Sequence, residues 1–172
     1  MNETTSTTSS IDFQVLASTT PNFRRVDTIP ESLQGSIQMA VTDFLRTSHI
    51  PKGVDQKGLY QQTLGSISQA TFLRQGGDFW IATLDGKLCA YLLARIVVDI
   101  DNRLTYWVSQ AWVHKDWRRS PEVKLGWQKI RERAKNCLCS HIVIVSSRST
   151  KAYLRWLGKD WTTYVTLLKE DI

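Results

Sequence analysis

The side chains that could do chemistry gather in two short stretches of this 172-residue chain. In the first, His114-Lys115-Asp116, an imidazole lies two residues from a carboxylate and could pair with it as acid and base. The second, Cys137-Leu138-Cys139-Ser140-His141, offers two thiols and an imidazole. Each has a plainer interpretation, which we favour: the first as a solvated turn, the second as a helix end in which Cys137 is a small core residue.

The cysteines indicate neither a metal site nor a disulfide framework. Zinc sites usually space their cysteines by two to four residues and need four ligands, and the sequence has no second cluster. A nucleophile pair of Cys139 and His141 lacks an obvious third group to orient it. With Cys89, the cysteines number three, which is odd and untypical of a disulfide framework. We expect no metal and a reducing, cytoplasmic location.

Positive charge is the third feature, with a formal net charge of +6 at pH 7. This charge suits an anionic partner, such as a phosphate-bearing cofactor, nucleic acid or an acidic protein surface, and equally suits plain solubility. Because Trp127 falls on the apolar face of a predicted helix and Trp112 on a central strand, we expect both in the core. A stacking surface for single-stranded nucleic acid is therefore not favoured, although cations and tryptophans alternate nearby. The residues of this stripe are Trp112, Trp117, Arg118, Arg119, Lys124 and Trp127.

Composition predicts a short tail followed by one domain. Residues 2–10 read NETTSTTSS, and these small polar side chains cannot bury apolar surface. We assign residues 1–10 to a flexible tail, which a protein partner could order, and residues 11–172 to a single domain. No signal peptide is visible. The stretch 88–98 is apolar apart from Arg95 and too short to span a bilayer, so we expect no membrane association.

Periodicity predicts the elements of the first half of the chain. Phe13, Val15 and Leu16 suggest a first strand. A helix should follow from Pro30, a residue favoured in a first turn. Its apolar residues recur at helical spacing: Leu33, Ile37, Ala40, Val41, Phe44 and Leu45. A second helix is expected over about 55–74.

In the second half the pattern becomes that of strands. Strands are predicted over 79–84, 88–98 and 104–113, with Asp85-Gly86 as a two-residue hairpin turn. An amphipathic helix should follow Pro121. A strand over 141–145, a helix over 150–157 and a strand over 161–168 complete the order. Three antiparallel strands followed by a β-α-β crossover predict an α/β (α+β) fold with a mixed sheet.

This order, from about Ile11 to the C-terminus, resembles the GNAT superfamily of acyl-CoA N-acyltransferase-like proteins. The segment Ala111-Trp112-Val113-His114-Lys115-Asp116-Trp117-Arg118 resembles the fourth strand of the family and its run into the cofactor loop. The segment 147–158 (SRSTKAYLRWLG) resembles the late helix, which typically ends in Leu-Gly. The resemblance implies a three-layer fold with a central, mostly antiparallel sheet splayed between strands four and five.

The resemblance also implies a cofactor, acetyl-CoA or another acyl-CoA, and an amine acceptor. The pantetheine arm would lie along the main chain of Ala111, Trp112 and Val113. The pyrophosphate would lie at the following helix N-terminus, where free N–H groups and the helix dipole favour anions. The residues implied there are Arg118, Arg119, Ser120 and Lys124. Tyr153, one residue from the position of the tyrosine that gives the leaving thiolate its proton in the family, is the implied acid.

The cofactor loop departs from the pattern of the family, which is Arg or Gln, two residues, Gly, one residue, then Gly or Ala. Arg118 matches, but Pro121 and Val123 occupy the glycine positions, so one donor N–H is lost and a branched side chain replaces bare backbone. Glu122 adds a carboxylate near the expected diphosphate. Strand four also carries no Asp or Glu that could act as a base.

Two hypotheses stay open. The chain is an acyl-CoA-dependent N-acyltransferase with a divergent loop, or it is a GNAT-fold protein without catalysis that serves as a structural or interaction component. In the second case it is similar to small GNAT-like proteins of podovirus-type tailed phages, in the virion or its assembly pathway. Its location would then be the virion or the cytoplasm of the infected host.

Overall fold

A computed structural model describes residues 22–48, 50, 53–72, 77–118 and 120–144 of the chain. In chain order the elements are β1 (Asn22–Arg25), α1 (Glu31–Thr47), α2 (Gln56–Phe72), β2 (Asp78–Leu84), β3 (Lys87–Val98), β4 (Leu104–Val113), the short 3₁₀ helix η1 (Lys115–Trp117), α3 (Pro121–Asn136) and β5 (His141–Ile144). Among the helices described, none is long and apolar enough to cross a membrane.

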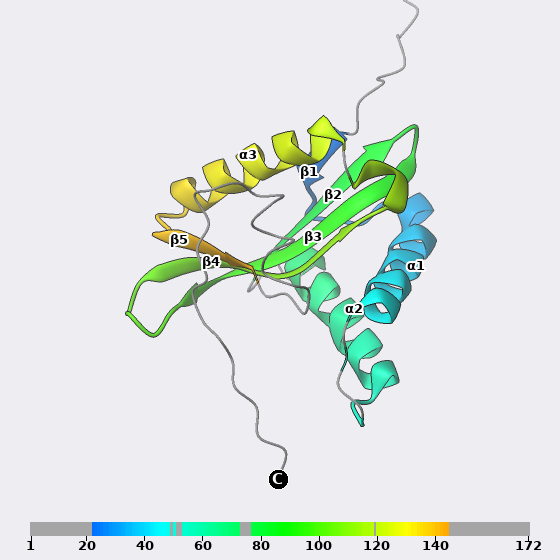
Figure 1. Ribbon diagram of the computed structural model, residues 1–172, viewed down its shortest axis with the longest axis horizontal. Coiled ribbons are helices and arrows are strands. Elements are labelled where there is room, and N and C mark those ends of the chain that lie inside the picture. Colours follow the sequence, from blue (N-terminus) through cyan, green and yellow to red (C-terminus); the bar gives the residue numbers. More distant parts are fainter. Residues whose placement is uncertain (1–21, 49, 51–52, 73–76, 119, 145–172) are drawn as a thin grey trace, which may run out of the picture.

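The strands form one mixed sheet in the order β1-β2-β3-β4-β5. Pairing is antiparallel from β1 to β4 and parallel between β4 and β5, as the predicted meander and crossover require. Between β2 and β3, Asp85 and Gly86 adopt φ values of 48° and 72°, the left-handed conformations that a tight two-residue hairpin demands. Figure 1 shows the long twisted hairpin of β3 and β4 at the centre of the molecule.

Helices cover both faces of the sheet, which makes three layers (Figure 1). On one face α1 and α2 pack against a core that includes Phe79, Ile81 and Tyr91. On the other face α3 packs through Ile130 and Ala134 onto alternate sheet residues. Because successive side chains of a strand point to opposite faces, each central strand supplies both cores.

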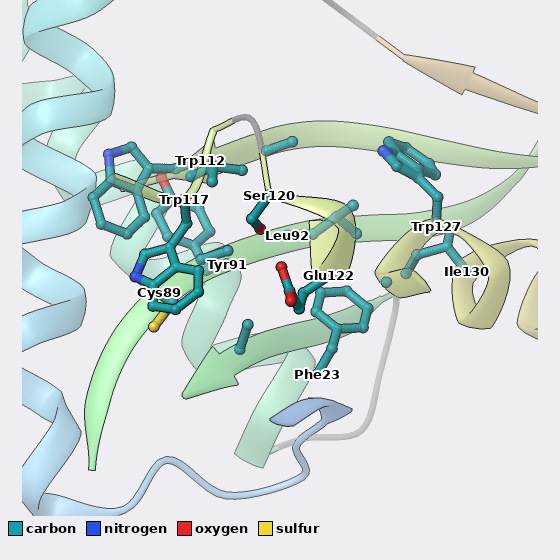
Figure 2. Close-up of a pocket in the computed structure, with 15 residues that line it drawn as sticks. Phe23, Cys89, Tyr91, Leu92, Trp112, Trp117, Ser120, Glu122, Trp127 and Ile130 are labelled. Carbon is teal, nitrogen blue, oxygen red and sulfur yellow. The ribbon is translucent and has the colours of Figure 1, made fainter. Parts of the chain in front are cut away.

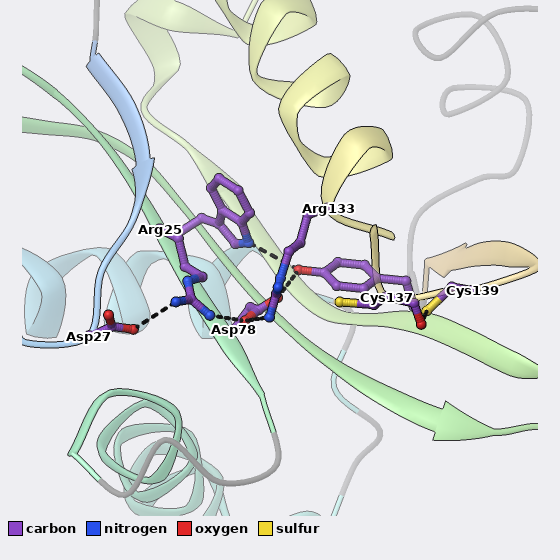
Figure 3. Close-up of polar contacts among 8 residues, drawn as sticks. Arg25, Asp27, Asp78, Arg133, Cys137 and Cys139 are labelled. Carbon is purple, nitrogen blue, oxygen red and sulfur yellow. Dashed lines mark hydrogen bonds and ion pairs between the residues drawn. The ribbon is translucent and has the colours of Figure 1, made fainter. Parts of the chain in front are cut away.

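A buried carboxylate ties the α3 layer to the sheet (Figure 3). Asp78, at the start of β2, has a side chain 6% exposed and accepts hydrogen bonds from Arg133 of α3 at 2.8 and 3.2 Å. It also accepts one from Arg25 of β1 at 3.0 Å and one from the Tyr106 hydroxyl of β4 at 2.8 Å. The indole N–H of Trp80 donates in turn to the Tyr106 oxygen at 3.0 Å. One side chain thus joins three strands and a helix.

The predicted fold class is confirmed, with differences at the ends of the chain. Both early helices, the three-strand meander and the helix after Pro121 lie where the sequence indicates. The expected strand near Phe13, the helix over 150–157 and the strand over 161–168 fall outside the described residues. The first described strand, β1, was not predicted, because Asn22-Phe23-Arg24-Arg25 has no apolar alternation. The predicted strand over 141–145 is described from His141 to Ile144, as β5, and these four residues are half-buried.

Candidate functional site

A bulge in β4 sets the geometry of the candidate site. Leu93 of β3 lies opposite Gln110, whereas the next residue, Ala94, lies opposite Val108, so Ser109 is an extra residue on β4. Its hydroxyl donates to the Leu93 carbonyl at 3.2 Å. A bulge leaves its extra residue out of the ladder and bends the strand. It also turns Gln110 to the α2 face of the sheet, although Val108, two residues earlier, packs on the α3 side.

The pairing that the structure describes between β4 and β5 lies before this bulge. It joins Thr105–Val108 to His141–Ile144, and β4 continues to Val113. Within the described residues, no strand pairs with the last five residues of β4 on that edge. Among the described residues, the main-chain groups of β4 past the bulge that point away from β3 therefore have no strand partner.

The residues that present those groups follow from the ladder. The N–H of His114 donates to the Cys89 carbonyl of β3 at 2.8 Å. Because the main-chain groups of successive residues point to opposite edges, those of Ala111 and Val113 point away from β3. Consistent with this, the Val113 carbonyl accepts a hydrogen bond from Arg118 Nε at 3.1 Å. The edge therefore offers both groups of Ala111 and the N–H of Val113 to a ligand.

Trp112, between these two residues, turns its side chain to the opposite face. Its indole stacks on Tyr91 at 6.0 Å between ring centroids, and its Nε1 donates to Asp43 of α1 at 2.9 Å. Hydrogen bonds from Trp112 and then from Arg46 hold the pKa of Asp43 below its ordinary value. These contacts fix the end of β4 against α1.

On the α3 side, a small apolar cavity of about 50 Å³ lies beneath the first turn of α3 (Figure 2). Ala111 and Val113 line it together with aromatic side chains from three other elements: Phe23, Trp117 and Trp127. Ser120 and Glu122 also line it. Figure 2 shows the Glu122 carboxylate directed between Ser120 and Phe23.

Ser120 is the N-cap of α3, but its side chain makes no capping hydrogen bond. Its Oγ is buried and has no hydrogen-bond partner among the described residues. A buried hydroxyl without a partner costs free energy, so this atom is suited to a ligand group. The next residue, Pro121, is the first residue of α3 and brings no N–H, and Glu122 adds a negative charge in the first turn. The N-terminal end of α3 thus offers an anion one unpartnered hydroxyl, but it lacks one N–H donor and carries a repelling carboxylate.

A second, polar cavity of about 400 Å³ lies on the other face of the sheet, against α2. Ser109 and Gln110 of β4 and Arg95 of β3 line it from the sheet side. The α2 side contributes Leu59, Gln62, Thr63, Ser66, Gln69 and Ala70. The Gln110 amide bridges the two sides, donating to Thr63 Oγ1 at 2.8 Å and accepting from the Tyr91 hydroxyl at 3.2 Å.

The structure brings together part of the predicted cofactor set. Ala111, Trp112, Val113 and Ser120 are among the residues that line the α3-side cavity. The Arg118 side chain donates a hydrogen bond to the Val113 carbonyl. Lys124 lies in the first turns of α3, where its side chain is outside what the structure describes. Arg119 and Tyr153 also lie outside the described residues.

Of the other chemistry-bearing stretches, the predicted turn at His114-Lys115-Asp116 lies at the surface, whereas Cys137 is half-buried and Cys139, not Cys137, packs against the core. His114 Nδ1 lies 3.4 Å from Asp116 Oδ2, with both side chains exposed, and His114 caps the short helix η1. Cys137 ends α3 as its C-cap. All three cysteines are free, and no group of three His, Cys, Asp or Glu residues that could hold a metal ion occurs in the described part of the chain.

Three features of the site could not be found in the sequence. The bulge at Ser109 has no signal, because β4 reads as an unbroken strand. Asp43 is one of several polar residues on α1, and only its distance from Trp112 distinguishes it. The direction of the main-chain groups of Ala111 and Val113 depends on the register of β4 against β3. All three depend on contacts between residues far apart in the sequence.

Comparison with known proteins shows likeness in structure and none in sequence. No protein-family model and no curated protein matches the sequence. A putative acetyl transferase from Pyrococcus furiosus aligns with a TM-score of 0.63 at 14% identity, over 88% of this chain and 99% of the other. An aminoglycoside 6'-N-acetyltransferase from Acinetobacter baumannii gives 0.61 at 18% identity, over 88% and 99%.

A third similar structure is the ribosomal-protein-alanine N-acetyltransferase from Brucella melitensis. Its TM-score is 0.57 at 14% identity, over 87% of this chain and 99% of that protein. Identities this low show the fold alone. The fold that the sequence resemblance implies, that of the GNAT superfamily, is therefore confirmed.

Proposed function

We propose that this GNAT-fold chain is an acyl-CoA-dependent N-acyltransferase that binds its cofactor along the free edge of β4. One observation carries the proposal: past the bulge at Ser109, the main-chain groups of Ala111 and Val113 point away from β3, and the described β5 residues pair only with Thr105–Val108. The main chain of Ala111 and Val113 is thereby left without a strand partner on that edge, within the described residues. An extended arm with amide groups can hydrogen-bond to such an edge as an added strand would.

The residues of the site fit the pantetheine arm of an acyl-CoA better than they fit its diphosphate. The unpartnered Ser120 hydroxyl and the free end of the Arg118 guanidinium are suited to a phosphate oxygen. Arg119 and Lys124 would add positive charge. Pro121 and Glu122 weaken this end of the site, by a missing N–H and a repelling carboxylate. We therefore expect weaker cofactor binding than a glycine-rich loop would give.

An acyl-CoA supplies its acyl group as a thioester, which an amine can attack. The new carbon–nitrogen bond forms as the carbon–sulfur bond breaks; the attacking nitrogen loses a proton to solvent, and the leaving thiolate gains one. Tyr153 is our proposed source of that proton. On the α2 side of the bulge, the Gln110 amide is held by Thr63 and Tyr91, so its orientation toward an acceptor is fixed before binding.

A titration of CoA followed by calorimetry tests the proposal at Ala111. Proline at this position removes the main-chain N–H that points away from β3, whereas valine adds side-chain bulk and keeps the N–H. We expect Ala111→Pro to weaken CoA binding by about tenfold, since a hydrogen bond contributes about 1 kcal/mol and proline also stiffens the edge. Ala111→Val should bind within about threefold of the wild type. Equal losses in the two variants, in folded protein, would contradict binding along this edge.

A second candidate function is that of a non-catalytic GNAT-fold binding or structural protein, such as a phage virion or assembly component. The observation that favours it is the state of the cofactor loop. Pro121 begins α3, the Glu122 carboxylate points into the α3-side cavity, and Arg118 already occupies the Val113 carbonyl. The same titration separates the candidates, because this one predicts no heat of CoA binding. A protein partner, and a location in the virion or host cytoplasm, would belong to this case.

A further inference from the structure

We infer that the polar cavity against α2, defined above by Gln110, Arg95 and Thr63 among its lining residues, selects an acceptor amine that also carries a carboxylate. Calling this ligand an acceptor rests on the proposed function, but the predicted binding of the amine can be measured without a cofactor. The cavity adjoins the bulge residue Ser109, so a ligand in it lies beside the free edge of β4.

The charge of the cavity excludes a polycationic acceptor. Of its described lining residues, Arg95 alone is charged, and no carboxylate faces the cavity from either side. A ligand with several ammonium groups would meet one cation and no anion, which is repulsive. In a ligand with one amine and one carboxylate, the carboxylate can pair with Arg95.

The hydrogen-bonding groups of the cavity also favour a ligand rich in acceptor atoms. Gln110 uses one N–H of its amide on Thr63 and makes no second donation within the described part of the chain. Thr63 accepts that bond and donates none that the structure describes. Arg95 forms no ion pair or hydrogen bond there, although its guanidinium has five N–H donors. Unused donors from α2, β3 and β4 therefore surround one space.

Arg95 is suited to a carboxylate by its shape as well as its charge. A planar guanidinium matches a carboxylate through two parallel hydrogen bonds, which an ammonium or an amide nitrogen cannot reproduce. Arg95 follows Leu93 on the same face of β3, so it lies one step beyond the residue that contacts the bulge. A carboxylate held at Arg95 leaves the amine end of a short ligand free to reach toward Ser109 and Gln110.

Four small amines with the same three-carbon chain test the inference by saturation-transfer NMR on the cofactor-free protein. β-Alanine, β-alaninamide, propylamine and 1,3-diaminopropane differ only at the third carbon, which belongs to a carboxylate, an amide, a methyl group or an aminomethyl group. We expect β-alanine to bind at least about fivefold more tightly than 1,3-diaminopropane. In Arg95→Gln this preference should disappear. In the matched control Arg103→Gln, which removes an equal charge from the exposed β3–β4 turn, it should persist.

Binding of the diamine as tightly as β-alanine, a preference that survives in Arg95→Gln, or no binding of any of the four at tens of millimolar would overturn the inference. Because CoA is absent, these results do not depend on the proposed function. If the amines bind as expected and the CoA titration gives no heat, the cavity stands as a binding site in a non-catalytic chain. If CoA binds and the amines do not, the acyltransferase proposal survives and the acceptor class is wrong.

Discussion

At the residue scale, Asp78 joins α3 to the sheet. Its carboxylate is buried and satisfies Arg25, Arg133 and Tyr106 together. Asp78→Asn keeps the shape but leaves the Arg133 guanidinium without its anion and Arg25 with only the exposed Asp27, so we expect it to lower the free energy of unfolding by about 3 kcal/mol. Denaturant unfolding measures this change.

The matched control for Asp78 is Asp27, which pairs with the same Arg25 at 3.3 Å but is 46% exposed. Exposed ion pairs contribute little, so Asp27→Asn should cost less than about 1 kcal/mol. Equal costs for the two substitutions would show that the network around Asp78 does not hold α3 to the sheet.

The same carboxylate predicts how stability depends on pH. Burial alone would raise the pKa of Asp78, but hydrogen bonds from Arg133, Tyr106 and Arg25 outweigh burial and hold it below its ordinary value. A carboxyl group whose pKa is lower in the folded state than in the unfolded state stabilises the fold at pH values above its unfolded-state pKa, which is about 3.9 for Asp. This contribution is lost as the pH falls through the folded-state pKa.

We therefore expect the wild type to lose stability below about pH 4, and Asp78→Asn to lose less over the same range. The pKa values of Asp43 and Asp99 are also lowered, but both proteins share these groups. The difference between the two stability curves therefore isolates Asp78. Parallel curves down to pH 2 would contradict the assignment.

At the scale of elements, the first turn of α3 decides how well an anion binds. Glu122 lines the cavity there and faces the place proposed for the diphosphate. Glu122→Gln removes the repulsion, so we expect CoA affinity to rise by about threefold, at a small cost in helix stability because an acidic first turn favours the helix dipole. Glu132→Gln, on the exposed side of the same helix, should leave the affinity unchanged. Equal effects of both would mean that net charge, and not the position of Glu122, governs binding.

Elements also differ in how far the sequence predicts them. The apolar spacing from Leu33 to Leu45 fits only a helix, and Asp85-Gly86 between apolar runs fits only a tight hairpin, so both were predicted correctly. β1 could not be predicted, because its place at the sheet edge rests on pairing with β2 and on Phe23 stacking on Trp80 at 5.3 Å. The residues of β1 alone do not indicate such contacts with a strand far along the chain.

At the scale of the whole molecule, the bulge joins the two faces of the sheet. The α3-side cavity and the polar cavity against α2 lie on opposite faces, and Ser109 lies in the strand between them. A cofactor along the edge of β4 and an acceptor under α2 would therefore meet at the bulge. The sequence predicted the fold and the strand β4. It did not predict the second cavity, whose residues come from α2, β3 and β4 and converge only in three dimensions.

The measurement that tests the account most directly is the response of assigned main-chain amide resonances of the ¹⁵N-labelled protein to added CoA. Our account predicts that the amides of Ala111 and Val113 shift with increasing CoA and follow one binding curve. Those of Thr105 and Tyr106, which lie in the part of β4 that is paired with β5, should stay in place. Shifts confined to other regions, or no shifts at millimolar CoA, would contradict binding along the free edge of β4.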